Sequence, residues 1–326
     1  MTAKAASGGV RPFRMISGVS KLADLADGMG ALGGVVAAGG KWYYCDPANG
    51  TGTGETAETA SASLADVYGL CRDGKNDGVF FIGGATAYAQ AAAFDWSKDY
   101  THLIGLSADL PGNGQRCRIV GAAATALTPL MTFSGNGCVI SNIQFNNEYA
   151  TGAVGGVLVT GERNLFVNCF FMHPASVTAA SYALKLSGDE CAFVRCSIGQ
   201  TQSRLRNLAT YGAWLFTSAN GTKFIACEFK SWSDLTTHIH VKIDAITSEG
   251  WSVQFEDCMF QNLGNNLVAY GIVDGQTNAY HQVIFRGNNN LLVKCTAVSD
   301  QLSYTYVKDT QTSSTSGLRS VAVAES

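Results

Sequence analysis

A pair of acidic side chains is the first chemistry to look for, because two carboxyls held about 5–10 Å apart can hydrolyse a glycosidic bond. Glu228 and Asp257 are the nearest such pair in the repeat described below, one copy apart and two positions out of step. On a stacked solenoid they could lie within about 10 Å of each other. We expect them to be exposed acids on a solvated face, so no catalytic residue is predicted.

Histidine offers a second kind of chemistry. His238 and His240, at i and i+2, would share one face of a strand, where two imidazoles could ligate a metal. No third ligand is near them in the sequence, so we expect both at the surface and predict neither a metal nor another cofactor. The glycine-rich segment 50–54 (GTGTG) lacks the Lys-Ser/Thr of a P-loop, which argues against nucleotide. Calcium held by that loop's oxygens stays as an alternative.

Two tryptophans could bind sugars. Trp232 and Trp251 lie in the longer, late copies of the repeat and, if exposed, could stack on sugar rings. The alternative is that they pack between loops or subunits.

A six-residue sequence motif, here called the phrase, recurs six times along the chain and contains both Glu228 and Asp257. Its fourth residues are separated by 26, 27, 31, 31 and 37 residues, a spacing typical of stacked repeats. The copies are 140–145 (ISNIQF), 166–171 (FVNCFF), 193–198 (FVRCSI), 224–229 (FIACEF), 255–260 (FEDCMF) and 292–297 (LVKCTA).

Each copy is predicted to be one half-buried strand, with its first, fourth and sixth residues facing inward and its third and fifth outward. A second apolar segment ending in a Gly/Asn turn precedes five of the copies, so one coil would hold two strands and a variable return. Stacking such coils closes a core. The predicted inward ladders are Phe166, Phe193, Phe224 and Phe255, and Cys169, Cys196, Cys227, Cys258 and Cys295.

Stacked coils of this kind resemble the pectate-lyase-like superfamily over about residues 115–300. The resemblance predicts an all-β fold, a right-handed single-stranded parallel β-helix. The superfamily includes polysaccharide lyases, glycosidases, phage tailspikes and non-enzymatic virion proteins, so the fold leaves the function open.

The segment before the solenoid is predicted to cap it. Residues 41–47 (KWYYCDP) and 79–82 (VFFI) are predicted strands, and 61–71 (SASLADVYGLC) is a predicted helix with Leu64, Val67 and Tyr68 facing the core. This order looks like the opening of many phage β-helix proteins, where the helix covers the open end. We divide the chain into an N-terminal arm and linker (1–40), a cap and first irregular coil (41–114), the β-helix (115–300) and a C-terminal strand or tail (301–326).

Composition excludes several partners. A net charge of −3, from 22 Lys and Arg against 25 Asp and Glu, leaves no basic field for nucleic acid. No apolar run approaches the roughly 20 residues of a membrane span. The five cysteines outside the phrase have no zinc-type spacing. We predict reduced thiols and synthesis in a host cytoplasm.

The resemblance and the lack of clustered acids favour a virion structural protein. We expect a capsid decoration, or cement, protein on the capsid exterior, bound to the phage major capsid protein as a homotrimer. The basic residues Lys4, Arg11 and Arg14 are the expected capsid contacts. The alternative is a tailspike or tail-fibre module that binds or cleaves host surface polysaccharide.

Overall fold

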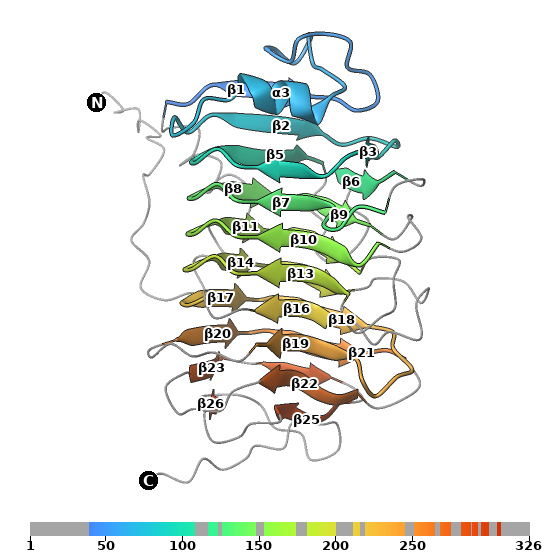
Figure 1. The fold of residues 1–326 in the computed structure, drawn as a ribbon, viewed down its shortest axis with the longest axis vertical. Helices are drawn as coiled ribbons and strands as arrows, with labels where there is room; N and C mark the ends of the chain where they lie inside the picture. The colour runs from blue at the N-terminus through green and yellow to red at the C-terminus, as the bar shows by residue number, and fades with distance from the viewer. Residues whose placement is uncertain are drawn as a thin grey trace, which may run out of the picture.

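The computed structural model describes residues 39–107, 117–122, 126–147, 153–173, 181–199, 211–215, 219–244, 251–264, 268–274, 282–287, 289–292, 295–299 and 305–307. These residues form a right-handed parallel β-helix with one short helix at its N-terminal end (Figure 1). The predicted fold is therefore confirmed. Residues 1–38 of the predicted N-terminal arm and linker (1–40) lie outside the described residues.

Three parallel sheets, here called A, B and C, form the walls of the solenoid. Sheet A contains β1 (Trp42–Cys45), β2 (Gly78–Ile82), β5 (His102–Leu106), β8 (Val139–Ser141), β11 (Leu165–Val167), β14 (Ala192–Val194), β17 (Thr222–Ile225), β20 (Ser252–Glu256), β23 (Gln282–Arg286) and β26 (Thr305–Val307).

Sheet B contains β3 (Tyr88–Gln90), β6 (Arg118–Gly121), β9 (Gln144–Asn146), β12 (Phe170–Met172), β15 (Ser197–Gly199), β18 (Glu228–Ser231), β21 (Met259–Asn262) and β24 (Asn290–Leu292). Sheet C contains β4 (Phe94–Trp96), β7 (Met131–Phe133), β10 (Gly155–Val159), β13 (Tyr182–Leu186), β16 (Tyr211–Leu215), β19 (Ile239–Ile243), β22 (Val268–Asp274) and β25 (Cys295–Ser299).

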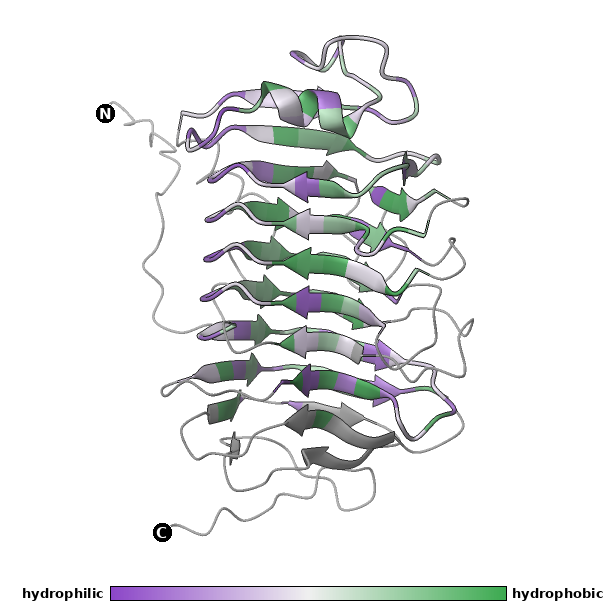
Figure 2. Ribbon diagram, in the orientation of Figure 1, coloured by the Kyte–Doolittle hydropathy of each residue, from purple (hydrophilic) through white to green (hydrophobic). Residues whose placement is uncertain are grey.

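Each coil has three strands, so the predicted coil of two strands is wrong. The chain runs through a strand of sheet C, turns into sheet A, and turns again into sheet B before it returns. Figure 2 shows the apolar strands stacked on one another, with hydrophilic residues gathered at the turns between sheets C and A. We call these turns the C-to-A corner and the turns between sheets A and B the A-to-B corner.

The six-residue phrase contains the A-to-B corner. In the second copy, β11 ends at Val167, Asn168 turns the chain, and β12 begins at Phe170. The third residue of each of the first five copies has a left-handed backbone, with φ of 57° at Asn142, 52° at Asn168, 54° at Arg195, 51° at Ala226 and 52° at Asp257. The phrase is therefore two short strands joined by a bend, and the prediction of one strand is wrong.

Ala226 gives a test of this corner. An alanine at φ 51° adopts a conformation that glycine adopts without steric cost, and two coils later Gly287, at φ 67°, occupies the same corner. Ala226→Gly should raise the free energy of unfolding by about 0.5 kcal/mol, measured by urea denaturation. The matched control is Ala192→Gly in the regular strand β14, which should lower it by a similar amount. If Ala226→Gly is as destabilising as the control, the corner geometry is wrong.

The inward ladders fill the core. Phe193 stacks on Phe166 and on Phe224 with ring centroids 4.9 Å apart in each case, and Phe224 stacks on Phe255 at 5.3 Å. The four thiols at Cys169, Cys196, Cys227 and Cys258 are buried, and each Sγ lies 3.3–3.5 Å from the backbone carbonyl oxygen of the first phrase residue one coil earlier. All nine cysteines whose side chains are described are free thiols.

The sixth copy of the phrase is wrong. Phe255 pairs in register with Phe285, and Phe260 pairs with Leu291, so the sixth corner lies at Gly287. Cys295 instead begins β25 in sheet C, where it pairs with Val268, and it is not part of the thiol ladder. In the coil after Cys258, buried Asn289 takes the place of the ladder cysteine. Its Oδ1 accepts the Cys258 amide at 2.8 Å. One extra residue between Gly287 and Asn290 breaks the phrase in this coil, so the letters of the phrase match a later segment instead.

The helix α3 (Leu64–Leu70) closes the N-terminal end of the core (Figure 1). Ser63 caps its first turn by accepting the Asp66 amide, and Leu64, Val67 and Tyr68 are buried as predicted. At the other end, the Lys98 ammonium donates to the carbonyls of Tyr68, Gly69 and Cys71. A cation there satisfies carbonyls that a helix leaves unpaired.

Candidate functional site

The outward ladders of the three sheets are the surfaces on which this fold could carry a site. Register places Glu228 in the outward ladder of sheet B, after Gln144, Phe170 and Ser197 and before Met259. Glu256 is in that of sheet A, between Ile225 and Arg286. In sheet C the outward ladder begins at Asp95 and continues through Thr132. Along these three ladders, each sheet carries one carboxylate.

Glu228 is held in an ion pair on its own strand. Its Oε2 lies 3.0 Å from Lys230 Nζ, and the two side chains are 34% and 14% exposed. The lysine on its own strand neutralises this carboxylate, and its neighbours in the ladder, Ser197 and Met259, supply no second carboxyl.

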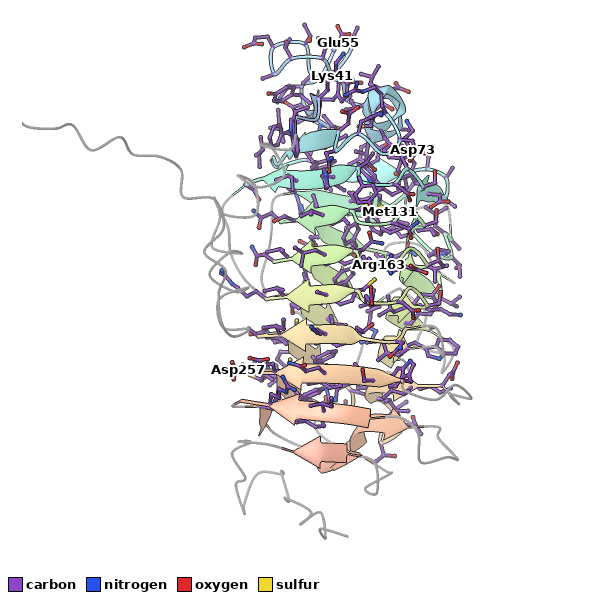
Figure 3. All side chains as sticks on the ribbon, turned by 90° about the vertical axis from the view of Figure 1, so that its left-hand side faces the viewer. Lys41, Glu55, Asp73, Met131, Arg163 and Asp257 are labelled. Atoms are coloured by element: carbon purple, nitrogen blue, oxygen red, sulfur yellow. The ribbon has the colours of Figure 1, made fainter. Side chains whose placement is uncertain are left out.

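Asp257 occupies the A-to-B corner and does not share a ladder with Glu228. Asp257 is exposed. Its carboxylate lies so close to Gly287 that a Cβ at position 287 would collide with it. Figure 3 shows it at one margin of the solenoid, apart from Asp73 and Arg163. The fold thus directs Glu228 outward from sheet B and sets Asp257 at a bend, because the third residue of the phrase lies at a corner and not on a face.

The acids that do occupy successive coils lie at the C-to-A corner, which the phrase did not reveal. Asp73 Oδ1 accepts the Asp99 amide, Asp99 Oδ1 accepts the Asn136 amide, and Asn136 Oδ1 accepts the Glu162 amide, each at 2.7 Å. Further along the chain, Asp189 Oδ1 accepts the Asn220 amide and Asn220 Oδ1 accepts the Ser252 amide, each at 2.9 Å. These oxygens satisfy turn amides, so the ladder is structural. The recurring Asn or Asp in the predicted turns was its signal in the sequence.

The histidines are buried, so the predicted surface placement of His238 and His240 is wrong. Both are 1% exposed, and their ring centroids are 5.1 Å apart. The structure adds His173, 1% exposed, with its ring 5.5 Å from that of His238. His240 Nε2 donates to the Gln261 carbonyl at 3.1 Å. Among the residues with described positions, no group of His, Cys, Asp or Glu is arranged to hold a metal ion.

Burial controls the charge of these rings. Desolvation lowers the pKa of His173 to about 3, with a further contribution from His240, and it lowers the pKa of His240 to about 4. His102, on the outer face of sheet A, has its pKa lowered to about 4 by burial as well. All three are therefore neutral at pH 7.

Aromatic side chains are distributed differently from the prediction. Trp251 is 1% exposed and belongs to the core, so it is not a sugar platform, and Trp232 is half-buried. Trp214, on the outer face of sheet C, is the aromatic side chain flanked by cations. Lys185 Nζ lies 4.4 Å and Lys242 Nζ 5.0 Å from its ring, and Lys242 also pairs with Asp244 at 3.2 Å. We call Lys185, Trp214 and Lys242 the Trp214 platform.

Comparison with known proteins supports the fold. No protein-family model and no curated protein matches the sequence. Among solved structures, a pectin methylesterase from Aspergillus niger is 14% identical, with 88% of this chain and 87% of that one covered and a TM-score of 0.54. Pectate lyase Pel9A is 12% identical, with 84% and 81% covered and a TM-score of 0.47. ORF18 of Geobacillus virus E2 is 13% identical, with 88% and 62% covered and a TM-score of 0.42. The similarity to the pectin methylesterase, at 14% identity, shows a shared parallel β-helix fold and nothing about activity.

No helix in the described part of the chain is long and apolar enough to cross a membrane.

Proposed function

We propose that this protein is a non-enzymatic structural component of a bacteriophage virion, a decoration protein on the capsid exterior. The observation that carries the proposal is that the outward ladders place one carboxylate on each sheet. Glycoside hydrolysis needs two carboxyls about 5–10 Å apart. Because adjacent rungs of a ladder are about 4.8 Å apart, this would require acids on adjacent or alternate rungs of one ladder. In the described part of the chain, no outward ladder carries two acids on adjacent rungs.

Three further features support this role. The cap, a strand followed by α3 and β2, has the order predicted from the phage-like opening of the sequence. Lys4, Arg11 and Arg14 are the proposed contacts with an acidic capsid surface, on charge alone. A homotrimer is proposed because the faces of the solenoid carry few charges, which favours self-association.

A second candidate function rests on the Trp214 platform. Two ammonium groups beside an indole could bind an acidic glycan, which is the chemistry expected of a tail module that recognises host polysaccharide. The structural alternative is that the two lysines only stabilise the Trp214 ring on an exposed sheet face. The experiments below separate the two functions.

The test of the proposed function is the position of the protein on purified particles. Gold-labelled antibody should bind the capsid shell, and cross-linking should join the chain to the major capsid protein. Particles that lack the protein should also lose their genome at lower temperature than complete particles. Label confined to the tail tip would contradict the proposal.

The purified protein should not degrade host surface polysaccharide. Glu228→Gln and Asp257→Asn should then change nothing in a glycan-degradation assay, and Asp95→Asn serves as the matched control in the outward ladder of sheet C. Cleavage that either of the first two changes abolishes, and the control does not, would establish an enzyme. Binding without cleavage that is lost in Trp214→Ala would favour the second candidate.

A further inference from the structure

The outer face of sheet A carries an apolar strip whose side chains are buried although they point away from the core. Val194 alternates with the inward Phe193, so it faces outward, and its neighbours in the same ladder are Val167 and Ile225. These three side chains are 3% exposed at Val167, 0% at Val194 and 1% at Ile225. In the same ladder Ile104 is 1% exposed and is separated from Val167 by Ser141; Ile104, Val167, Val194 and Ile225 define the sheet A strip.

Rungs above and below cannot bury an outward aliphatic side chain completely, because one face of each residue still points to solvent. The described apolar residues that pack against the three are Leu165 and Ala226, which belong to the same coils. The strip must therefore be covered from outside the sheet. It ends at β17, since the ladder continues as the charged residues Glu256 and Arg286.

We propose that residues 15–38 of the same chain pack across the sheet A strip as a strap. These residues directly precede β1, the first strand of sheet A, so they enter at the N-terminal end of the strip. Even as a continuous helix they would span about 36 Å at 1.5 Å per residue. The distance from β1 to β17, six rungs, is about 29 Å.

The composition of the segment fits an apolar surface. On a helix over 17–29, Leu22, Leu25 and Met29 would lie along one side. Other apolar residues of the segment are Met15, Ile16, Val19, Leu32, Val35 and Val36. A second copy of the protein is the competing occupant, but the strip is already buried within one chain.

Full-length variants test the strap through the additivity of their effects. Val194→Lys alone, and Leu22→Lys, Leu25→Lys and Met29→Lys together, should each lower Tm by at least about 4 °C, because each displaces the same contact. Combining the two sets should cost little more than the larger single effect. The milder Val194→Thr repeats the cycle if the lysine variant does not fold.

Leu158→Lys, at a half-exposed outward position of sheet C, is the matched control, and its effect should add fully to that of the segment variant. The proposal is overturned if Val194→Lys adds in full as the control does, or if the segment variant leaves Tm unchanged. A Tm loss that depends on protein concentration would assign the strip to a second copy and overturn it as well. None of these outcomes depends on where the protein is found on a particle.

Discussion

Phe193→Ala is expected to lower the free energy of unfolding by about 3–5 kcal/mol, the largest effect of any single substitution considered. Phe193 is fully buried in the middle of the stack, between Phe166 and Phe224, and Phe171 meets its ring edge-on at 5.9 Å. Alanine would leave a cavity that regular backbone rungs on both sides cannot close. Urea denaturation followed by circular dichroism measures the loss.

Two variants control this measurement. Phe193→Leu keeps most of the volume and should cost no more than about 1.5 kcal/mol. Lys223→Ala, at the exposed residue next to Phe224, should stay within about 0.5 kcal/mol of the parent protein. A loss below about 1 kcal/mol in Phe193→Ala would mean that the stack does not hold the coils together.

The protein is expected to lose stability steeply between pH 6.5 and pH 4. Burial lowers the folded-state pKa of His173 to about 3 and those of His102 and His240 to about 4, whereas an unfolded histidine titrates near 6.5. In this interval the unfolded state binds protons that the folded state does not, so acid favours unfolding. Each ring contributes up to about 1.4 kcal/mol per pH unit.

Asp77 acts outside this interval. Burial tends to raise the pKa of Asp77, but hydrogen bonds from Arg72 and from the Lys41 and Arg72 amides lower it to about 2. Its contribution is present above about pH 4 and is lost only as the pH falls toward 2. Urea midpoints at pH 7, 6 and 5 are therefore free of the Asp77 contribution.

A combined His102→Gln, His173→Gln and His240→Gln variant should flatten the pH dependence even if it is less stable at pH 7. A parent protein whose urea midpoint is the same at pH 7 and pH 5 would contradict the burial of these rings.

Some features of the fold followed from local sequence. The recurrence of Phe and Cys at coil spacing predicted inward ladders, because a parallel solenoid places like positions of successive coils on top of one another. A helix was predicted over 61–71 and forms at Leu64–Leu70, since Ser63 is a good N-cap and Leu64, Val67 and Tyr68 have helical spacing.

Other features needed the three-dimensional arrangement, although one had a signal in the sequence. The first and fourth phrase residues cannot both face inward on a straight strand, where sides alternate, so the bend at the third residue was implicit. Asparagine at two of the bends is typical of a left-handed residue, but Arg195 and Ala226 are not. The sixth copy matched by letter and failed in register, because the corner lies at Gly287 and one extra residue between Gly287 and Asn290 breaks the phrase there.

The sequence by itself determined that the chain stacks coils and which residues face the core, because the period of a solenoid is written directly in its apolar positions. Only the tertiary structure decided which acids share a surface and which histidines are buried away from water. It also showed that an outward strip of sheet A is covered. These properties depend on contacts between segments tens of residues apart, which no local pattern specifies.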